Sequence, residues 1–156
     1  MREIPKKNYY FLIVLIVVTI FITLLLASLY KNKTKEVSNF YNYSNNITSK
    51  EFNEYLLENT DLIIYMADKY DLSYSSFENN FKSKLDELNL KDKFVYIDKS
   101  ELNEKFLKKL EEKYKIRIDT NRLPVIIVMI DENVINVSYI NEGSNAEEII
   151  NYEAFE

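Results

Sequence analysis

The run Leu62-Ile63-Ile64-Tyr65-Met66-Ala67 contains no charged residue and is followed, after a polar loop at 68–73, by apolar residues at helical spacing. A short apolar run bounded by turn residues is typical of a buried strand, and an i, i+3, i+4 pattern is typical of an amphipathic helix. The stretch 62–88 therefore predicts a strand, a loop and a helix. Ser73 is expected to cap this helix. Its inward-facing residues are expected to be Tyr74, Phe77, Phe81, Leu85 and Leu88.

Similar patterns flank this stretch on both sides. Thr48-Ser49-Lys50-Glu51 has the form of a capping box and predicts a short helix that ends near residue 59. A second strand is predicted at 94–97, and Ser100 is expected to cap a further helix. The inward-facing residues of that helix are expected to be Leu102, Phe106, Leu107 and Leu110.

The last third of the chain predicts a β-hairpin and a closing helix. The apolar run 123–130 begins with Leu123-Pro124, and the segment 134–140 alternates apolar and polar residues after a turn at Asp131-Glu132-Asn133. Ser144-Asn145-Ala146-Glu147 has the form of a second capping box. The apolar residues of the expected closing helix are Ile149, Ile150, Tyr152 and Phe155.

The N-terminal part predicts a membrane anchor. Residues 9–30 carry no charge and match the roughly 20 residues that span a bilayer, whereas the alternative, a cleaved signal peptide, has a shorter apolar region. A basic tail at 1–8 precedes this segment, and a polar tether without periodicity is expected at 31–46. Lys31, Lys33 and Lys35 after the segment nearly balance Arg2, Lys6 and Lys7 before it. Because a short basic tail before the first apolar span usually stays inside, we expect a single-pass protein of the cell membrane with its C-terminal domain outside the cytoplasm.

The composition excludes several classes of function. The 156 residues include no Cys and no His, which removes thiolate chemistry and the commonest general base and metal ligand. The first thirty residues hold three basic residues and one acidic residue, so a net charge of −5 overall leaves −7 on the remainder, and nucleic-acid binding is not expected. Asp68, Asp71 and Glu78 lack the spacing of a calcium loop, so neither a metal site nor a cofactor is predicted.

The order of the elements resembles that of the thioredoxin-like fold, an α/β fold with a central mixed sheet flanked by helices. The segment 63–67 followed by Phe77 resembles the frame around a C-x-x-C redox site, and Leu123-Pro124-Val125 resembles the loop that carries the cis-proline of that fold. The lead-in at 47–52 is similar to small membrane-anchored bacterial thioredoxin-like proteins of the bacteriocin transport accessory type. The resemblance covers 47–156, which we expect to be one domain.

This resemblance implies the position of a site and the absence of its two redox cysteines. Asp71 and Tyr74 fall at the positions of the two cysteines, with Leu72 and Ser73 between them. Neither a carboxylate nor a phenol can replace a thiolate in disulfide exchange, so the resemblance implies a redox-inactive protein rather than a catalyst. Asp71 also has a purely structural interpretation as a helix-capping residue.

Two hypotheses of function remain. In the first, the backbone beside Leu123 and Pro124 binds a protein or peptide partner in an extended conformation, without catalysis. In the second, the protein is a structural membrane subunit in which the transmembrane helix itself is the interaction element. Thr19, Thr23 and Ala27 lie at four-residue spacing on one face of that helix. A non-redox enzyme stays open as a third reading.

Overall fold

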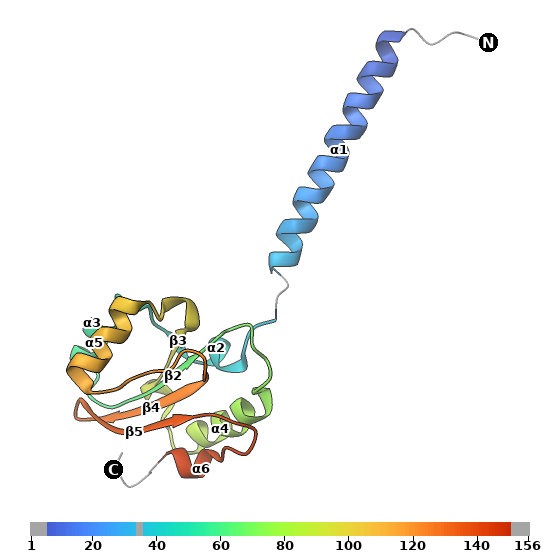
Figure 1. Ribbon diagram of the computed structural model, residues 1–156. Coiled ribbons are helices and arrows are strands. Elements are labelled where there is room, and N and C mark those ends of the chain that lie inside the picture. Colours follow the sequence, from blue (N-terminus) through green and yellow to red (C-terminus); the bar gives the residue numbers. More distant parts are fainter. Residues whose placement is uncertain (1–5, 34–35, 151–156) are drawn as a thin grey trace. The chain divides into compact units, whose positions relative to one another are not determined.

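The computed structural model describes residues 6–33 and 36–150, with side chains at 9–29 and 36–150. The chain forms two compact units, Met1–Glu36 and Val37–Glu156. The described part of the first unit is one helix, and the second unit contains a sheet flanked by helices (Figure 1).

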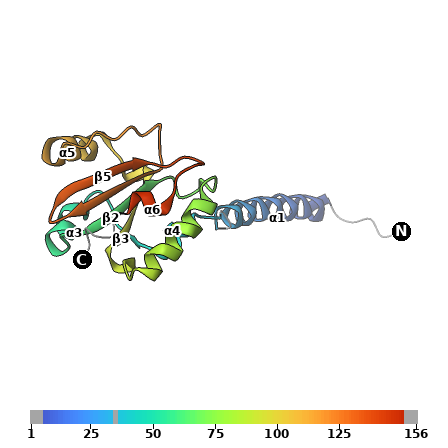
Figure 2. The same ribbon diagram turned by 90° about the horizontal axis from the view of Figure 1, so that it is seen from below.

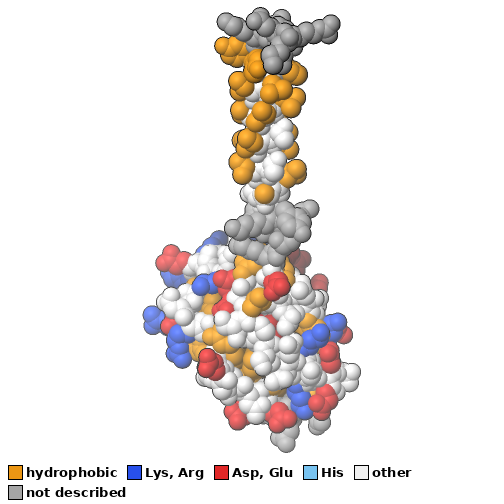
Figure 3. Space-filling view, turned by 90° about the vertical axis from the view of Figure 1, so that its right-hand side faces the viewer, with side chains coloured by type: hydrophobic (Ala, Val, Ile, Leu, Met, Phe, Trp, Pro, Cys, Tyr) orange, Lys and Arg blue, Asp and Glu red, His pale blue; other side chains and the backbone are white. Residues whose placement is uncertain are grey.

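The helix of the first unit, α1 (Lys6–Lys33), includes the predicted apolar segment. Its stretch Tyr9–Leu29 is long and apolar enough to cross a membrane, because 21 residues rise about 31 Å and the hydrocarbon layer is about 30 Å thick. Figure 3 shows hydrophobic side chains along α1. The hydroxyls of Thr19 and Thr23 donate to the carbonyls of Leu15 and Thr19 at 2.8 Å, so both are satisfied within the helix.

The second unit is built on a five-stranded sheet with the order β1-β3-β2-β4-β5. The strands β1 (Asn45–Asn46), β3 (Phe94–Asp98) and β2 (Leu62–Ala67) are parallel, whereas β4 (Val125–Ile130) and β5 (Asn133–Tyr139) form an antiparallel hairpin whose β4 is antiparallel to β2. Every residue of β2 is buried. This explains the continuous apolar run in the sequence, since a central strand covered on both faces has no polar side.

Helices cover both faces of this sheet (Figures 1 and 2). On one face, α3 (Phe52–Glu58) and α5 (Glu104–Tyr114) pack against alternate residues of the strands, including Ile64 and Val95. On the other face, α2 (Asn39–Tyr43), α4 (Ser75–Glu87) and α6 (Ala146–Ile149) pack against residues that include Ile63 and Tyr65. Short 3-10 turns, Lys91–Lys93 and Lys99–Glu101, flank β3.

This arrangement is the thioredoxin-like α/β fold, and the predicted fold class is confirmed. The strand order, the parallel pairing of β1, β3 and β2, and the antiparallel hairpin after β4 carry the assignment. The predicted inward residues of α4 also agree with the structure. Phe77, Phe81 and Leu85 are buried, and Tyr74 and Leu88 are partly buried against the same core.

The prediction that 31–46 forms a polar tether is wrong for residues 39–46, which form α2 and β1. Phe40 is fully buried, and β1 pairs with β3 through Asn45 and Asn46. The domain therefore begins near Val37 rather than at residue 47. The sequence does not reveal this, because one buried aromatic residue makes no periodic pattern and the two asparagines join the sheet through backbone hydrogen bonds.

Three predicted helix caps also differ from the structure, whereas the Thr48–Glu51 capping box is confirmed by reciprocal hydrogen bonds. Ser73 does not cap α4, which begins at Ser75. The cap of α5 is Asn103, whose side chain accepts from Phe106, and not Ser100. In each case the helix starts later than expected, where the intervening residues form turns.

The closing helix begins in a similar way, with Asn145 rather than Ser144 as its cap. The Ser144 hydroxyl accepts instead from the N–H of Asn141 in the preceding turn. Ile149 and Ile150 are buried as predicted, whereas Tyr152 and Phe155 lie outside the described residues.

The turn of the β4–β5 hairpin has two residues, because Ile130 pairs directly with Asn133. Asp131 and Glu132 both have positive φ, at 50° and 60°, which is the backbone of a type I′ turn. The two residues with positive φ are therefore Asp131 and Glu132. Asn133, whose side chain tolerates positive φ best, lies just after them in β5. The N–H groups of Asp131 and Glu132 hold this backbone in place by donating to Asp61 and Thr60, at 3.1 and 3.0 Å.

Candidate functional site

A polar hollow of about 220 Å³ lies at the C-terminal end of β2. It brings together the loop after β2 and the segment before β4, which are about fifty residues apart in the sequence. Its lining residues are Tyr65, Ala67, Asp68, Asp71, Tyr74, Lys99, Thr120, Asn121, Leu123 and Pro124. The volume is below the roughly 300–1,000 Å³ of small-molecule pockets, and it suits a single side chain.

The loop 68–74 forms one wall of the hollow and is held by its own aspartates. Asp68 Oδ1 accepts from the N–H of Tyr70, and Asp71 Oδ1 accepts from the N–H of Ser73, both at 3.0 Å. These local turns delay the start of α4, since the side chains bind backbone groups before the helix begins. Each aspartate uses one oxygen in this way, so the other can accept from a ligand.

Lys69 connects this loop to its neighbours. Its N–H donates to Asp98 Oδ1 at 3.1 Å, its ammonium lies 3.7 Å from Asp98 Oδ2, and its carbonyl accepts from the N–H of Ser38 at 2.8 Å. The ammonium also lies over the ring of Tyr41. The loop is therefore fixed both to β3 and to the segment that leads into α2.

The segment before β4 forms the opposite wall. Asp119 Oδ1 accepts from the N–H of Asn121, and the Asp119 carbonyl accepts from the N–H of Arg122, both at 3.0 Å. The guanidinium of Arg122 lies 4.5 Å from the centre of the Tyr139 ring. These contacts hold Thr120 and Asn121 in a fixed turn beside the hollow.

The peptide bond between Leu123 and Pro124 is cis, as the resemblance implies. Leu123 lies just before both ladders of β4, which begin at Val125. The Pro124 carbonyl accepts from Ile140 at 2.9 Å, but neither backbone group of Leu123 has a hydrogen-bond partner among the described residues. These two groups are available to an extended chain that lies alongside.

Two buried tyrosines lie beneath the site. The Tyr65 hydroxyl donates to Glu78 Oε1 at 3.2 Å, and the Tyr96 hydroxyl donates to the Ala67 carbonyl at 3.1 Å. Burial raises the pKa of both phenols, and the negative charge of Glu78 raises that of Tyr65 further. Both phenols therefore keep their protons at neutral pH and act as hydrogen-bond donors rather than bases.

The hollow gathers polar and charged side chains, with two carboxylates and one ammonium among them. Ser73 is exposed and is not part of the hollow's lining, so this serine is not paired with a base in the hollow. Glu78, which we considered as a cation ligand with Asp68 and Asp71, points instead into the core, where it accepts from Ser38 and Tyr65. Within residues 6–33 and 36–150, no three acidic side chains are grouped as a metal site.

The structure brings together four of the six residues predicted for the site. Asp71, Tyr74, Leu123 and Pro124 line the hollow, whereas Leu72 and Ser73 do not. Sequence reasoning missed Lys99, Thr120 and Asn121. Thr120 and Asn121 could have been suggested by their position just before Leu123-Pro124, but Lys99 reaches the site only because β3 lies beside β2.

Comparison with known proteins finds similarity among solved structures. No protein-family model and no curated protein sequence matches the chain. Among solved structures, the chain is similar to mitochondrial thioredoxin 3 from Saccharomyces cerevisiae in its oxidised form, with a TM-score of 0.45 and 18% identity over 64% of this chain and 86% of that one. The assignment of the fold rests on the sheet topology described above. Since the chain holds no cysteine, it cannot supply the thiolate for thiol-disulfide exchange.

Proposed function

We propose that this chain is a single-pass protein of a bacterial cell membrane whose extracytoplasmic domain binds an extended segment of a protein partner without redox chemistry. In this role it acts as an accessory factor in secretion, assembly or a surface process, as the resemblance to the bacteriocin transport accessory type suggests. The observation that carries the proposal is the hollow beside Leu123, where unpaired backbone groups adjoin a side-chain pocket.

The charges of the hollow indicate which side chain enters it. Asp68 and Asp71 provide two carboxylates against the single ammonium of Lys99. Each carboxylate keeps one oxygen that accepts no hydrogen bond from the described residues. A lysine or arginine side chain of the partner matches this arrangement, because an ammonium or guanidinium donates to carboxylates in charge-assisted hydrogen bonds. The partner segment is thus extended and carries a basic residue.

The second hypothesis, in which α1 is the interaction element, receives less support. The hydroxyls of Thr19 and Thr23 already donate to carbonyls of their own helix. Their protons are therefore not free to bridge to a second helix, which is how such residues join membrane helices. We retain α1 as an anchor, in keeping with its length and apolar surface.

Binding of short peptides to the full chain in nanodiscs of phosphatidylcholine tests the site. A fluorescent alternating Val/Thr peptide with a central lysine is expected to bind, and its counterpart with glutamate at that position is expected to bind at least about tenfold more weakly. Asp71→Asn keeps the Oδ1 acceptor for Ser73 but removes the charge, and it should weaken binding of the lysine peptide about fivefold.

Asp92→Asn is the matched control for that experiment, because Asp92 is exposed on the Lys91–Lys93 turn and is not among the residues of the hollow. It should leave the affinity unchanged. Equal affinities for the lysine and glutamate peptides would exclude recognition of a basic side chain. If the lysine peptide also fails to bind the unmodified chain, the proposed peptide site itself is wrong.

The proposed sidedness is tested separately. Protease added to intact cells is expected to remove the domain 37–156 while a cytoplasmic marker protein stays uncut. The expectation rests on the basic residues Arg2, Lys6 and Lys7 before the apolar stretch Tyr9–Leu29, which favour an internal N-terminus. Protection of the domain until the cells are lysed would place it in the cytoplasm.

A further inference from the structure

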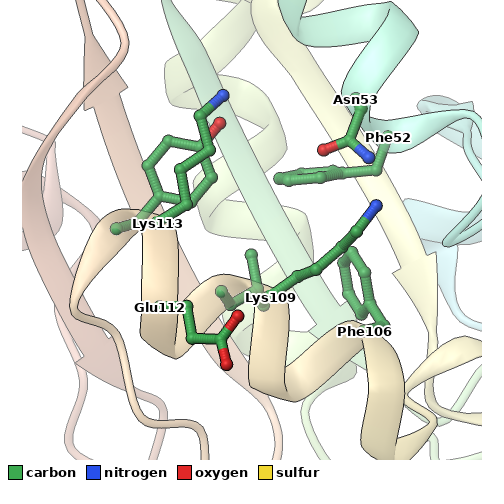
Figure 4. A pocket seen from close by; sticks show the side chains of 8 residues that line it. Phe52, Asn53, Phe106, Lys109, Glu112 and Lys113 are labelled. Carbon is green, nitrogen blue, oxygen red and sulfur yellow. The ribbon is translucent and has the colours of Figure 1, made fainter.

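A second concave surface lies on the other helical layer, between α3 and α5. It consists of two adjoining hollows of about 120 and 200 Å³, which share Asn53, Phe106 and Lys109. We call it the α3–α5 cleft. Its other lining residues are Phe52, Leu110, Glu112, Lys113 and Tyr114 in the smaller hollow, and Ser49, Lys50, Asn103 and Lys105 in the larger. Figure 4 shows the smaller hollow, with Phe52 and Asn53 of α3 facing Lys109 and Lys113 of α5.

The charge of this cleft is opposite to that of the chain. Four lysines, Lys50, Lys105, Lys109 and Lys113, line it against one acidic residue, Glu112, although the net charge of the whole chain is −5. Three of them recur every fourth residue along α5, which places them on one side of that helix. None of the four forms an ion pair with another described residue. The cleft is therefore a local site for negative charge.

The floor of the smaller hollow supplies a further donor. The Tyr114 hydroxyl oxygen is buried and has no hydrogen-bond partner within the described part of the chain. The Lys113 ammonium lies 4.8 Å from the centre of the Tyr114 ring. An ammonium only donates, however, so it cannot accept the phenolic proton. An unpartnered buried donor is unfavourable, and an acceptor that entered the hollow would relieve this cost.

The shape of the cleft indicates the size of its ligand. Each hollow is smaller than the roughly 300–1,000 Å³ of a small-molecule pocket, and the two share three lining residues. The rings of Phe52 and Phe106, with centroids 5.2 Å apart and edge to face, are buried and form the apolar base of the cleft. Two neighbouring side chains of one peptide fit this arrangement better than one compact molecule.

We propose that the α3–α5 cleft binds an acidic peptide segment of a protein partner, with one carboxylate in the smaller hollow. That carboxylate accepts from the Tyr114 hydroxyl and pairs with Lys109 and Lys113, whose long, exposed side chains swing over it. Lys50 and Lys105 meet a second acidic residue in the larger hollow. This site is separate from the hollow at Pro124, shares no residue with it, and prefers the opposite charge.

A fluorescent peptide of alternating glutamate and serine, with a glutamine counterpart, tests the proposal on the full chain in phosphatidylcholine nanodiscs. The glutamate peptide is expected to bind with an affinity that falls as salt rises, and the glutamine peptide is not. Lys109→Gln should weaken binding about tenfold, and Tyr114→Phe about fivefold. Tyr114→Phe should not lower the stability of the domain, since the deleted hydroxyl proton has no acceptor in the unbound protein.

Lys108→Gln is the matched control, because Lys108 lies on the same helix, is exposed and lines neither hollow. It should change the affinity less than twofold. A loss equal to that of Lys109→Gln would mean general attraction to a basic helix and would overturn the proposal. Saturable binding of free glutamate, or binding of phosphatidylglycerol vesicles but not of the peptide, would replace the acidic peptide by a different ligand.

Discussion

Phe40→Ala is expected to destabilise the domain by about 4 kcal/mol, within the range for truncating a buried phenylalanine. The Phe40 side chain is fully buried, and its ring lies 4.7 Å from those of Tyr65 and Phe94 and 5.7 Å from that of Phe81. Alanine would leave a cavity among three aromatic rings held by β2, β3 and α4, which cannot all move inward to fill it.

Urea unfolding of the full chain in detergent micelles, followed by near-ultraviolet circular dichroism, measures this effect through tyrosine packing. Leu57→Ala is the control, since Leu57 is 81% exposed on α3 and its truncation should cost less than about 0.5 kcal/mol. If the two variants were equally stable, residues 37–46 would be a tether after all, and α2 would contribute nothing to the core.

Phe40 also marks the limit of what the sequence could predict about the fold. The strands β2 and β4 were predictable because they are unbroken apolar runs, and α4 because its apolar stripe repeats with the helical period. The sequence around Phe40 contains neither an unbroken apolar run nor a helical apolar stripe. Its burial depends on the sheet being present, so it follows from tertiary packing rather than from a local pattern.

The choice of helix-capping residue also could not be predicted from the sequence. Ser100 and Ser144 have the residue type and spacing of caps, but Asn103 and Asn145, one to three residues later, accept the backbone hydrogen bonds instead. Both serines are bonded to other groups in the preceding turns. Since serine and asparagine cap helices about equally well, the turn geometry decides between them, and a pattern of residue types does not contain it.

The candidate site was predictable in position and only partly in composition. The resemblance placed Asp71, Tyr74, Leu123 and Pro124 together, and all four line the hollow. Lys99 and Asn121 were not predicted, because their positions depend on how loops from different strands converge.

The α3–α5 cleft was not predicted for a similar reason. The exposed residues of α5 carry charges of both signs, and only the packing of α3 beside the helix separates Lys109 from Lys108.

Glu78→Ala is expected to destabilise the domain by about 3 kcal/mol, because it removes the acceptor of three hydrogen bonds in the core. The carboxyl group of Glu78 accepts from the Ser38 hydroxyl at 2.8 Å, the Asn39 N–H at 3.0 Å and the Tyr65 hydroxyl at 3.2 Å. The side chain is only 2% exposed, so water cannot replace these bonds without opening the structure. Glu78→Gln should cost less, about 2 kcal/mol, since the amide oxygen can still accept while its NH₂ group faces one of the donors.

Glu87→Gln on the same helix is the control for Glu78, because Glu87 is exposed and pairs only with Lys84 on the surface. It should change stability by less than about 0.5 kcal/mol. The variant Ser38→Ala completes a double-mutant cycle. Once Glu78 is alanine, removing the Ser38 hydroxyl should cost less than it does in the unmodified chain, because that hydroxyl has lost its carboxylate acceptor and retains its contact with Tyr96. Independent, additive effects would mean that the buried carboxyl group is stabilised by other contacts.

The same cycle tests whether the start of the domain is joined to the candidate site. Ser38 binds Glu78 through its hydroxyl and the Lys69 carbonyl through its N–H, and Tyr65, which lines the hollow, donates to the same carboxyl oxygen as Ser38. Loss of Glu78 should therefore loosen both the entry to α2 and the loop 68–74. Amide hydrogen exchange is expected to become faster in these two segments in Glu78→Ala and to stay unchanged in Glu87→Gln. If exchange increased only at α2, the buried carboxyl group would hold the entry to the domain without supporting the site.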